Sequence, residues 1–548
     1  MDRDLESIQE VRFLVRQAKK AQEALYKYSQ EQVDRICSAM AQAAFAKAEE
    51  LARIAVEETG MGHVAGKTTK NQFSSRDVWN AIKDMKTVGI IGADESRKVF
   101  EIGEPAGIVC GIVPCTNPTS TAMFKAIIAL KARNAIVISP HPRAVKCIQA
   151  TVDVVYKAAL EAGAPPDCIS CMSIALLEGT NELMKHEDVA VILATGGSGL
   201  VKAAYSAGKP AYGVGPGNVP VVIERTANVA QAVTDIIMSQ QLDYGTICAS
   251  EQAVIVDAPI KDKVIEEFKR QKGYFASPEE IKKLEPVVIK GSLMNPEIVG
   301  LAPHKVAEKA GVKIPEDTSV LLCPLDGVGP KWPLSREKLC PVLAFYVEKD
   351  WEAACKRSVE ILEFGGIGHT LVLHSEDQKV IWEYAFRKPS FRVLINSPAS
   401  QGAIGYSTNL FPSMSLGCGT WAGNITSDNI SPRHLINIKR VAWGKGVQTP
   451  ATASTQGFGQ VEGLRRWAEQ GRQPFPSMVA AQGYRGAAPG VGAPQLLGGV
   501  VVPITASAGR PVAYAPPGAP TAMVAPRGFD CPVKTCPESK RGACHGCA

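Results

Sequence analysis

The sequence lacks the features that would place the protein in a membrane, outside the cell or on nucleic acid. No apolar run reaches the ~18 residues of a membrane-spanning helix, and the charged N-terminal residues contain no apolar signal segment. No long Lys/Arg run is present, and a net charge of +6 is small for 548 residues, so nucleic-acid binding is not indicated. The 15 cysteines are odd in number and irregularly spaced, which fits reduced thiols better than a disulfide framework. We therefore expect a soluble, cytoplasmic protein with neither a membrane nor a nucleic-acid partner.

What is present is the composition of an ordinary globular protein, 45% hydrophobic and 21% charged. The chain is too long for one core and should form about two or three domains. Apolar residues at helical spacing dominate residues 1–87, and short strand-like segments replace them between 88 and 106. We expect 88–106 to form an exposed β-ribbon that acts as an oligomerisation arm, because unpaired strand edges tend to be covered by a partner.

Apolar strands alternate with amphipathic helices over most of the remaining chain. This pattern indicates an α/β fold with a mostly parallel, doubly wound sheet. We expect residues 1–87 and 107–240 to form a Rossmann-like domain and residues 241–415 to form a second α/β domain. The stretch 416–447 is Gly-rich and then strand-like, and we assign it to the arm together with 88–106.

The stretch from Gln241 to Glu251 contains the first candidate for chemistry, Cys248. Gly245 loosens the backbone three residues before this cysteine, and the β-branched strand 253–256 follows it. A thiol at such a strand mouth can be a nucleophile if its pKa falls below the usual ~8.5, because only the thiolate attacks. A single cysteine beside a strand is more often a small buried hydrophobe, so the case for Cys248 as a nucleophile depends on the other motifs in the chain.

Three further motifs lie where strands end. Thr195-Gly-Gly-Ser-Gly199 joins a strand to a helix, where backbone N–H groups suit a phosphate or a nicotinamide ribose. The loop Ser139-Pro-His-Pro-Arg143 follows another strand, and ligands of doubly wound sheets bind at such carboxyl ends. Asn117 precedes Pro118 at a third strand end and can donate to a developing oxyanion. Each motif alone is also ordinary turn chemistry.

Taken together, the motifs resemble the aldehyde dehydrogenase superfamily, specifically its CoA-acylating branch. Within that branch the sequence is similar to the propionaldehyde and acetaldehyde dehydrogenases of bacterial microcompartments and to the aldehyde dehydrogenase half of bifunctional alcohol dehydrogenases. The resemblance covers about residues 5–447. The motifs that carry it, in chain order, are Asn117-Pro118, Pro140-His-Pro142, Thr195-Gly-Gly197, Cys248, Glu337-Lys-Leu-Cys-Pro341 and Gly365-Gly-Ile-Gly-His369-Thr370.

The resemblance implies a role for each site residue. Cys248 would be the nucleophile, Asn117 an oxyanion donor, and His369 would lie near the active-site mouth, where it either handles CoA or orients a neighbour. The domain of 1–87 and 107–240 would bind NAD and CoA, with Thr195, Gly196 and Gly197 at the nicotinamide half, Glu337 at its ribose, and Ser139 to Arg143 at the adenosine end. No metal is expected. The implied cofactor-binding residues are Ile112, Pro114, Thr116, Ser139, His141, Pro142, Arg143, Thr195, Gly196, Gly197, Gly215, Glu337 and Leu339.

Two departures from the hydrolytic members of the superfamily sharpen this expectation. Those enzymes carry a Glu-Leu-Gly-Gly segment whose carboxylate activates water, and the matching segment Tyr212-Gly-Val-Gly-Pro-Gly-Asn218 has no carboxylate. Their Lys-Pro at the adenosine ribose is Ser139-Pro140 here, which implies a looser grip that lets NADH leave before CoA enters. Without a general base a thioester hydrolyses slowly, whereas a thiol acceptor needs less help.

We therefore predict that a short-chain aldehyde, propionaldehyde in preference, reacts with NAD and CoA to give acyl-CoA and NADH through a Cys248 thioester. The expected assembly is a homodimer or homotetramer inside a bacterial microcompartment. Two alternatives stay open, a hydrolytic NAD-dependent aldehyde dehydrogenase that gives the free acid and a non-catalytic shell-associated protein. The sequence leaves open the aldehyde, NAD against NADP, and dimer against tetramer.

Residues 448–548 are rich in Ala, Pro and Gly and read as a flexible tail. One interpretation is an encapsulation helix at 459–472 that docks on shell proteins through Val461, Leu464 and Trp467. A second is metal binding by the terminal cysteines, although their spacing lacks the paired C-x2-C of a zinc ribbon. The third is an unpacked tail with adventitious thiols. The cysteines in question are Cys531, Cys536, Cys544 and Cys547.

Overall fold

The structure is a computed structural model that describes residues 2–445, so the expected encapsulation helix and the terminal cysteines lie outside the described residues. The chain begins with helices, as its periodicity predicts. Ser29 and Gln32 form the capping box that starts the second helix, and Gly60, with φ of 68°, ends the third. These first elements are α1 (Arg3–Leu25), α2 (Gln30–Ala46), α3 (Ala48–Thr59), α4 (Val64–Gln72), a π-helical turn (Phe73–Asp77) and α5 (Val78–Ile82).

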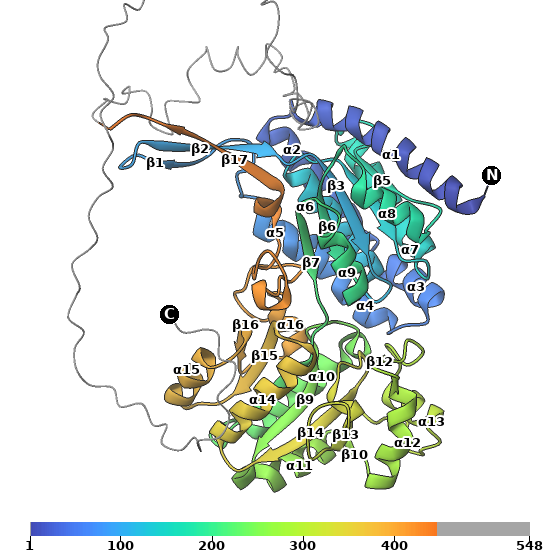
Figure 1. The fold of residues 1–548 in the computed structure, drawn as a ribbon, viewed down its shortest axis with the longest axis vertical. Coiled ribbons are helices and arrows are strands. Elements are labelled where there is room, and N and C mark those ends of the chain that lie inside the picture. The colour runs from blue at the N-terminus through green and yellow to red at the C-terminus, as the bar shows by residue number, and fades with distance from the viewer. Residues whose placement is uncertain (1, 446–548) are drawn as a thin grey trace, which may run out of the picture. The chain divides into compact units, whose positions relative to one another are not determined.

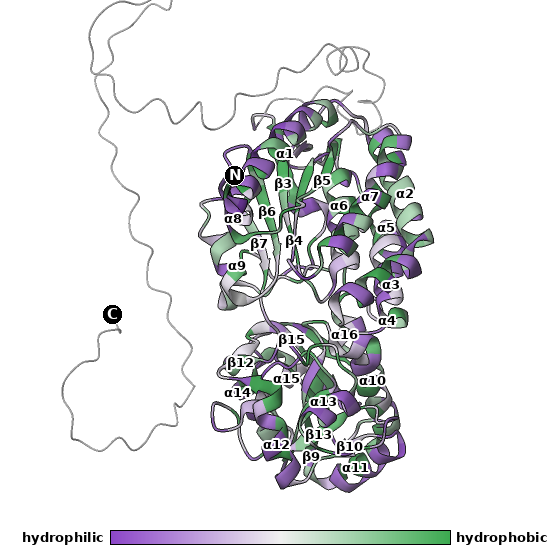
Figure 2. Cartoon of the chain, turned by 90° about the vertical axis from the view of Figure 1, so that its right-hand side faces the viewer, coloured by the Kyte–Doolittle hydropathy of each residue, from purple (hydrophilic) through white to green (hydrophobic). Residues whose placement is uncertain are grey.

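The first sheet has five parallel strands in the order β5-β4-β3-β6-β7. Helices cover both faces, with α1, α8 and α9 on one side and α2, α6 and α7 on the other (Figure 2). The central strand β3 and the whole of α6 are buried, and β3 is accordingly apolar throughout. The elements are β3 (Ile108–Val113), α6 (Pro118–Lys131), β4 (Ile136–Pro140), α7 (Val145–Glu161), β5 (Ile169–Cys171), α8 (Leu177–Lys185), β6 (Val189–Thr195), α9 (Ser198–Tyr205) and β7 (Ala211–Val214).

The second sheet has seven strands in the order β10-β13-β14-β9-β8-β15-β16, and all its pairs are parallel (Figure 1). Its strands are β8 (Val219–Ile223), β9 (Glu251–Asp257), β10 (Tyr274–Phe275), β13 (Leu321–Pro324), β14 (Val342–Glu348), β15 (Gly368–His374) and β16 (Ser390–Ile395). Its helices are α10 (Val229–Gln241), α11 (Lys261–Arg270), α12 (Pro278–Val288), α13 (Pro303–Lys309), α14 (Trp351–Gly365), α15 (Gln378–Phe386) and α16 (Ala399–Ala403). A small hairpin joins β11 (Ile289–Lys290) to β12 (Leu293–Met294).

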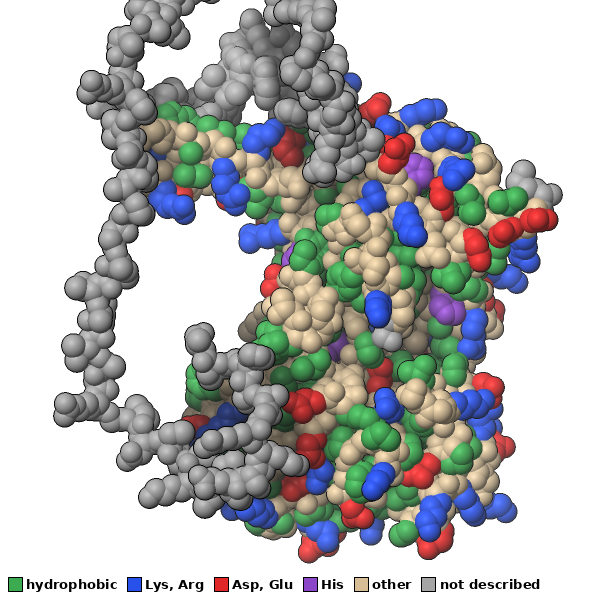
Figure 3. Space-filling model, in the orientation of Figure 1, with side chains coloured by type: hydrophobic (Ala, Val, Ile, Leu, Met, Phe, Trp, Pro, Cys, Tyr) green, Lys and Arg blue, Asp and Glu red, His purple; other side chains and the backbone are tan. Residues whose placement is uncertain are grey.

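The arm is a three-stranded antiparallel sheet in the order β1-β2-β17. It is built from β1 (Gly89–Asp94), β2 (Val99–Pro105) and β17 (Ile436–Ala442), so segments far apart in the sequence lie side by side (Figure 1). Ile438 and Val441 on the outer strand are each 39% exposed, and Figure 3 shows apolar side chains among charged ones along the arm. Across residues 2–445, no helix combines the length and the apolar character that crossing a membrane requires.

The α/β class with a Rossmann-like sheet is confirmed, but two boundaries fall elsewhere. Strand β8 lies within the expected first domain, yet it pairs with β9 and β15 of the second sheet. Residues 416–434, which we assigned to the arm, form a loop bridged from Leu416 to Asn429, and only β17 joins the arm. Apolar periodicity identifies a buried parallel strand but does not say which sheet it pairs with, because pairing depends on distant partners.

Candidate active site

Cys248 lies in the segment that connects α10 to β9, directly after a tight turn at Leu242–Gly245. Asp243, Tyr244 and Gly245 have φ of 57°, 50° and 71°, so three successive residues adopt the left-handed conformation. For the two that are not glycine this costs roughly 1–2 kcal/mol each. Surrounding contacts must therefore hold the turn in place.

The Asp243 carboxylate provides those contacts. It is fully buried and accepts hydrogen bonds from the His63 N–H at 2.9 Å, from Lys67 Nζ at 3.0 Å and from Lys70 Nζ at 2.7 Å. The Thr246 hydroxyl donates to it at 2.7 Å. Burial alone would raise the pKa of this carboxyl, but the two ammonium groups and the hydrogen bonds hold it below its usual value. The turn before Cys248 is thus fastened to α4.

Asn117 is the N-cap of α6, but its side chain does not cap the helix. Its Oδ1 accepts a hydrogen bond from Lys70 Nζ at 2.7 Å, and its Nδ2 makes a long contact of 3.3 Å with Thr116 Oγ1. Thr116 itself is held through its carbonyl oxygen by Lys67 Nζ at 3.0 Å. The amide nitrogen carries two N–H groups, so one remains for another acceptor beside the long contact to Thr116, which is what an oxyanion donor requires.

The loop between β7 and β8 closely approaches Cys248. A Cβ placed on Gly217 would lie 1.9 Å from the Cys248 carbonyl oxygen and 3.3 Å from Cδ2 of His369. Only glycine fits this position, and the contact shows that Gly217, Cys248 and His369 meet. The Gly217 N–H donates to Oε1 of Glu337 at 3.0 Å. The expected residues Cys248, Glu337 and His369 are therefore brought together around Gly217.

The thiol of Cys248 is not activated in this arrangement. Burial raises its pKa, the charges of Glu337 and Cys418 act in the same direction, and Arg392 opposes them. Arg392 donates to the Gly417 carbonyl at 2.6 Å and contacts Thr370. The lowered thiol pKa that a nucleophile requires is therefore not found in the resting site, because the desolvation of a thiolate outweighs one nearby guanidinium.

Glu337 and His369 are both neutral near pH 7. Burial raises the pKa of Glu337 to about 8, although the Gly217 N–H opposes it, so the carboxyl holds its proton. His369 is completely buried, and burial together with Arg392 lowers its pKa well below the usual value. Its Nδ1 pairs with Thr370 Oγ1 at 2.9 Å, and its Nε2 has no hydrogen-bond partner within the described part of the chain. The site holds polar groups but no ionised base beside the thiol.

The Gly-rich motif after β6 fits a bound dinucleotide. The Thr195 hydroxyl is buried and has no partner within residues 2–445, and a Cβ on Gly197 or Gly199 would meet no atom within 4 Å. This leaves space at the N-terminus of α9, where backbone N–H groups favour a phosphate or ribose oxygen. Thr195 pairs with Val214 across the sheet, and the chain then runs through Gly215 to Gly217 beside Cys248. The motif and the thiol therefore lie on connected, adjacent segments.

The adenosine-end residues are placed differently from one another. The Ser139 hydroxyl is buried and bonds to Thr180 Oγ1 at 2.8 Å, so this side chain is occupied within the fold. Arg143 donates from its backbone N–H to His141 Nδ1 at 3.1 Å and from its side chain to the Thr59 carbonyl at 3.4 Å. Pro142, between them, is exposed. The loop is accessible at 141–143 and not at Ser139.

At the remaining predicted positions, the contacts involve mainly backbone atoms. Ile112 is buried in β3, and its carbonyl accepts a hydrogen bond from Lys125. Pro114 lies in the half-buried loop after β3. Leu339, with φ of 51°, accepts from the Gly300 N–H at 2.9 Å. Gly196 follows β6, and a Cβ there would touch Leu200 at 2.8 Å.

Sequence reasoning missed Lys67, Lys70, Arg392 and Cys418. Two lysines one turn apart on a short helix are typical of a solvated face, and nothing in the sequence signals that Asp243 buries them. Asp243 belongs to the stretch around Cys248, and its position next to a candidate nucleophile was the one available signal. No comparable signal was available for Arg392 or Cys418.

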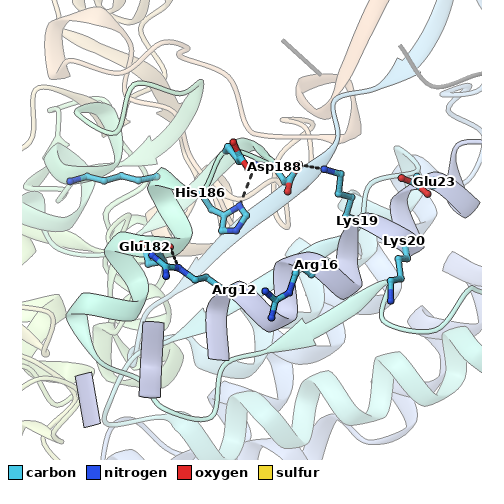
Figure 4. A pocket seen from close by; sticks show the side chains of 10 residues that line it. Arg12, Arg16, Lys19, Lys20, Glu23, Glu182, His186 and Asp188 are labelled. Atoms are coloured by element: carbon cyan, nitrogen blue, oxygen red, sulfur yellow. Dashed lines mark hydrogen bonds and ion pairs between the residues drawn. The ribbon is translucent and has the colours of Figure 1, made fainter. Parts of the chain in front are cut away.

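A hollow of about 720 Å³ lies elsewhere, between α1 and α8 (Figure 4). Its charges pair with one another, as Arg12 does with Glu182 at 2.7 Å and Lys19 with Asp188 at 2.5 Å. It contains none of the predicted site residues. We therefore place the chemistry at Cys248 and not in this hollow.

The fold is parallel α/β, and Cys248 meets Gly217, Glu337 and His369 where strand ends come together, an arrangement that suits a thiol-dependent enzyme. Residues 5–281 match the model of the aldehyde dehydrogenase family. The chain belongs to the aldehyde dehydrogenase family, which confirms the resemblance.

Three proteins illustrate the similarity. The bifunctional aldehyde-alcohol dehydrogenase AdhE of Escherichia coli (strain K12) is 46% identical over 441 residues, which cover 80% of this chain and 50% of that protein. The chain therefore spans about half the length of such relatives. An acetylating aldehyde dehydrogenase from Geobacillus thermoglucosidasius superposes with a TM-score of 0.80 and 53% identity over 82% of this chain and 99% of that one. A propionaldehyde dehydrogenase from the fucose utilisation microcompartment of Clostridium phytofermentans gives a TM-score of 0.72 and 28% identity over 80% and 98%.

Proposed function

We propose that this chain is a CoA-acylating aldehyde dehydrogenase that converts a short-chain aldehyde, NAD and CoA into acyl-CoA and NADH. The observation that carries the proposal is the charge state around Cys248. Glu337 holds its proton near pH 7, and the lowered pKa of His369 makes that imidazole a weak base. Water therefore has no strong base beside Cys248, whereas a thiol acceptor needs less help.

In the first half of the reaction, the Cys248 thiolate attacks the aldehyde carbonyl and forms a thiohemiacetal. Asn117 Nδ2 and the backbone N–H of Cys248 donate to its oxyanion, because Asn117 Oδ1 is already occupied by Lys70. NAD, when bound, accepts the hydride. We assign its nicotinamide half to Thr195, Gly196 and Gly197.

In the second half, the thiol of CoA attacks the acyl-Cys248 thioester, and the Cys248 thiolate leaves. The same two donors hold the oxyanion of this step, so the site needs only one oxyanion hole for both. Glu337 would contact the NAD ribose, with Gly215 and Leu339 beside it. The accessible loop of His141, Pro142 and Arg143 would receive the adenosine part, and Ser139, Ile112, Pro114 and Thr116 would shape its floor.

The substrate and setting are finer proposals. We infer a two- or three-carbon aldehyde, since one similar structure is an acetylating enzyme and another a propionaldehyde dehydrogenase. The second comes from a microcompartment, which supports that location for this chain. We also propose that the arm of β1, β2 and β17 joins copies of the chain into a homodimer or homotetramer.

The test is NADH absorbance from purified protein with NAD and either propionaldehyde or acetaldehyde, with and without CoA. Sustained turnover only with CoA, after at most a one-equivalent burst without it, is expected. Equal turnover without CoA would mean that water is the acceptor and that the enzyme is hydrolytic. No NADH in any mixture would favour a non-catalytic protein.

A further inference from the structure

Three buried charged side chains form a cluster between α4 and the Cys248 turn. Lys67 and Lys70 are each 2% exposed, and Asp243 is 0% exposed. Burying an unpaired ammonium is costly, and one carboxylate between two ammonium groups leaves the cluster with a net positive charge. Such a buried cluster is stable only if its hydrogen bonds are well placed. The partner of each hydrogen bond therefore shows which group the cluster holds in position.

The bonds of Lys70 reach two different parts of the site. Its Nζ donates to Asn117 Oδ1 at 2.7 Å and to Asp243 Oδ2 at 2.7 Å. The same Nζ lies 3.2 Å from the Thr246 carbonyl oxygen and 3.1 Å from its hydroxyl, two residues before Cys248. One ammonium therefore links the amide donor to the segment that carries the nucleophile.

The chemistry of an ammonium decides which way the Asn117 amide faces. An ammonium has donors only, so it can bond the amide oxygen and not the amide nitrogen. With Lys70 in place, Oδ1 is held at the cluster and Nδ2 is left on the other side. An amide rotated by half a turn would instead offer a carbonyl oxygen to the oxyanion, which repels it.

We propose that Lys70 is a positioning residue that fixes the Asn117 amide with its N–H groups toward the reacting carbonyl, with Asp243 holding Lys70 in place. The inference rests on the proposed function, because it uses the same oxyanion. Lys67 differs from Lys70 in a useful way. It shares Asp243 but bonds the backbone carbonyl of Thr116 and not the Asn117 side chain.

The packing of α4 supports this assignment. A Cβ on Gly66 would lie 2.6 Å from the Asp243 backbone nitrogen, and one on Gly62 would lie 1.8 Å from its Oδ1. The helix thus approaches the turn more closely than any other residue type at these positions would allow. Lys70 also interacts with Cys248 through its charge, so an effect on the thiolate must be separated from an effect on the amide.

The experiment compares the wild type with three single variants, Lys70→Met, Lys67→Met and Asn117→Ala. It also includes the two double variants that combine Asn117→Ala with Lys70→Met or with Lys67→Met. Acylation of Cys248 is followed as the burst of p-nitrophenolate from p-nitrophenyl acetate, which forms an oxyanion but needs neither NAD nor CoA. Alkylation of Cys248 by iodoacetamide, which forms no oxyanion, reports on the thiolate. Lys70→Met leaves Asp243 bonded to Lys67, so the fold should persist, and thermal unfolding checks this.

We expect Lys70→Met to slow acylation by about 10- to 100-fold, a fraction of the ~10²–10³-fold loss of an oxyanion donor. In the Asn117→Ala background the further loss should be less than about threefold, and alkylation should change less than about threefold. Lys67→Met should slow acylation only weakly, and by the same factor in the wild type and in Asn117→Ala. In the CoA-dependent assay the loss should appear in kcat and not in KM.

Equal losses from Lys70→Met with and without Asn117 would overturn the inference, as would alkylation that slows as much as acylation. No acylation of the wild type would remove the oxyanion assignment and the inference with it. If acylation behaves as expected but CoA gives no NADH turnover, the role of Lys70 stands and the proposed function fails.

Discussion

At the residue scale, the resting site keeps its nucleophile protonated. Burial, Glu337 and Cys418 all raise the pKa of the Cys248 thiol, and Arg392 and a backbone hydrogen bond oppose them without outweighing them. A protonated thiol is slow to oxidise or to react with stray electrophiles, because the thiolate is the reactive form. The thiolate must therefore be favoured by what binds next to it, which ties the reactivity of Cys248 to occupation of the site.

Replacing Cys248 by Ala should abolish CoA-dependent NADH formation, because no other group can carry the acyl intermediate. NAD binding, measured by fluorescence titration, should be retained. Cys171→Ser is the matched control, since Cys171 is also partly exposed but lies at the end of β5, and it should keep full activity. Appreciable turnover by the Ala variant would contradict the assignment of the nucleophile.

A second residue-scale prediction concerns Glu251, which is fully buried at the start of β9. Its Oε1 accepts from the Ala399 N–H at 2.9 Å. Burial raises its pKa to about 7, so between about pH 4.5 and 7 the folded protein keeps a proton that the unfolded chain releases. The contribution of this group to the free energy of unfolding is therefore full below that window and is lost as pH rises through it, by up to about 3 kcal/mol.

Glu251→Gln should remove this dependence, because the amide stays neutral. Its oxygen can still accept from the Ala399 N–H. Denaturant unfolding at pH 5, 6, 7 and 8 measures the effect. The stability of the variant relative to the wild type should rise with pH, and parallel curves would contradict the assignment.

At the element scale, helix α4 and the Cys248 turn form one unit. Asp243 and Tyr244 stay in a left-handed conformation that few side chains adopt, and the bonds from His63, Lys67 and Lys70 offset that cost. Helix α6 enters the same unit through Asn117. Any displacement of α4 should thus reach the oxyanion donor and the nucleophile together.

Gly66→Ala tests this coupling. The added methyl group would lie 2.6 Å from the Asp243 nitrogen and 2.7 Å from its Cα, so backbone must move, which typically costs ~1–3 kcal/mol. We expect a lower unfolding free energy by that amount and a fall in kcat of at least about tenfold. The exposed neighbour Ala65, changed to Ser, should alter neither quantity. Full activity of Gly66→Ala would mean that α4 and the turn move independently.

At the scale of the whole molecule, the arm joins segments that are far apart in the sequence. Strand β17 pairs with β2 from Pro105 to Val99, which brings residues more than 300 positions apart into register. The outer edges of this sheet, β1 and β17, are unpaired within residues 2–445. Edge strands with exposed apolar side chains are usually covered in the functional assembly.

The double variant Ile438→Lys and Val441→Lys should therefore shift the protein from a homodimer or homotetramer to a monomer. Lysine on an edge strand opposes pairing by charge and by removing apolar area. Sedimentation velocity measures the mass, with Asn437→Lys as a control that adds charge to the same strand without removing an apolar side chain. An unchanged mass in the double variant would mean that another surface joins the copies.

Much of the fold follows from local pattern. The capping box at Ser29, the stop at Gly60 and the apolar strands β3, β4, β6 and β9 were predictable, because helix ends and buried strands depend on neighbours within a few residues. The grouping of Cys248 with Glu337 and His369 followed from the family resemblance. The placement of β8 in the second sheet could not be predicted, since its apolar sequence suits either sheet equally.

The sequence by itself thus determined the family, the order of the elements and the chemical groups at the strand ends. Only the tertiary structure decided that Lys67 and Lys70 are buried, that Arg392 and Cys418 approach the thiol, and that the thiol is protonated at rest. The physical reason is desolvation. A charged side chain leaves water only when a partner replaces it, and for Lys70 that partner, Asp243, lies 173 residues away in the chain.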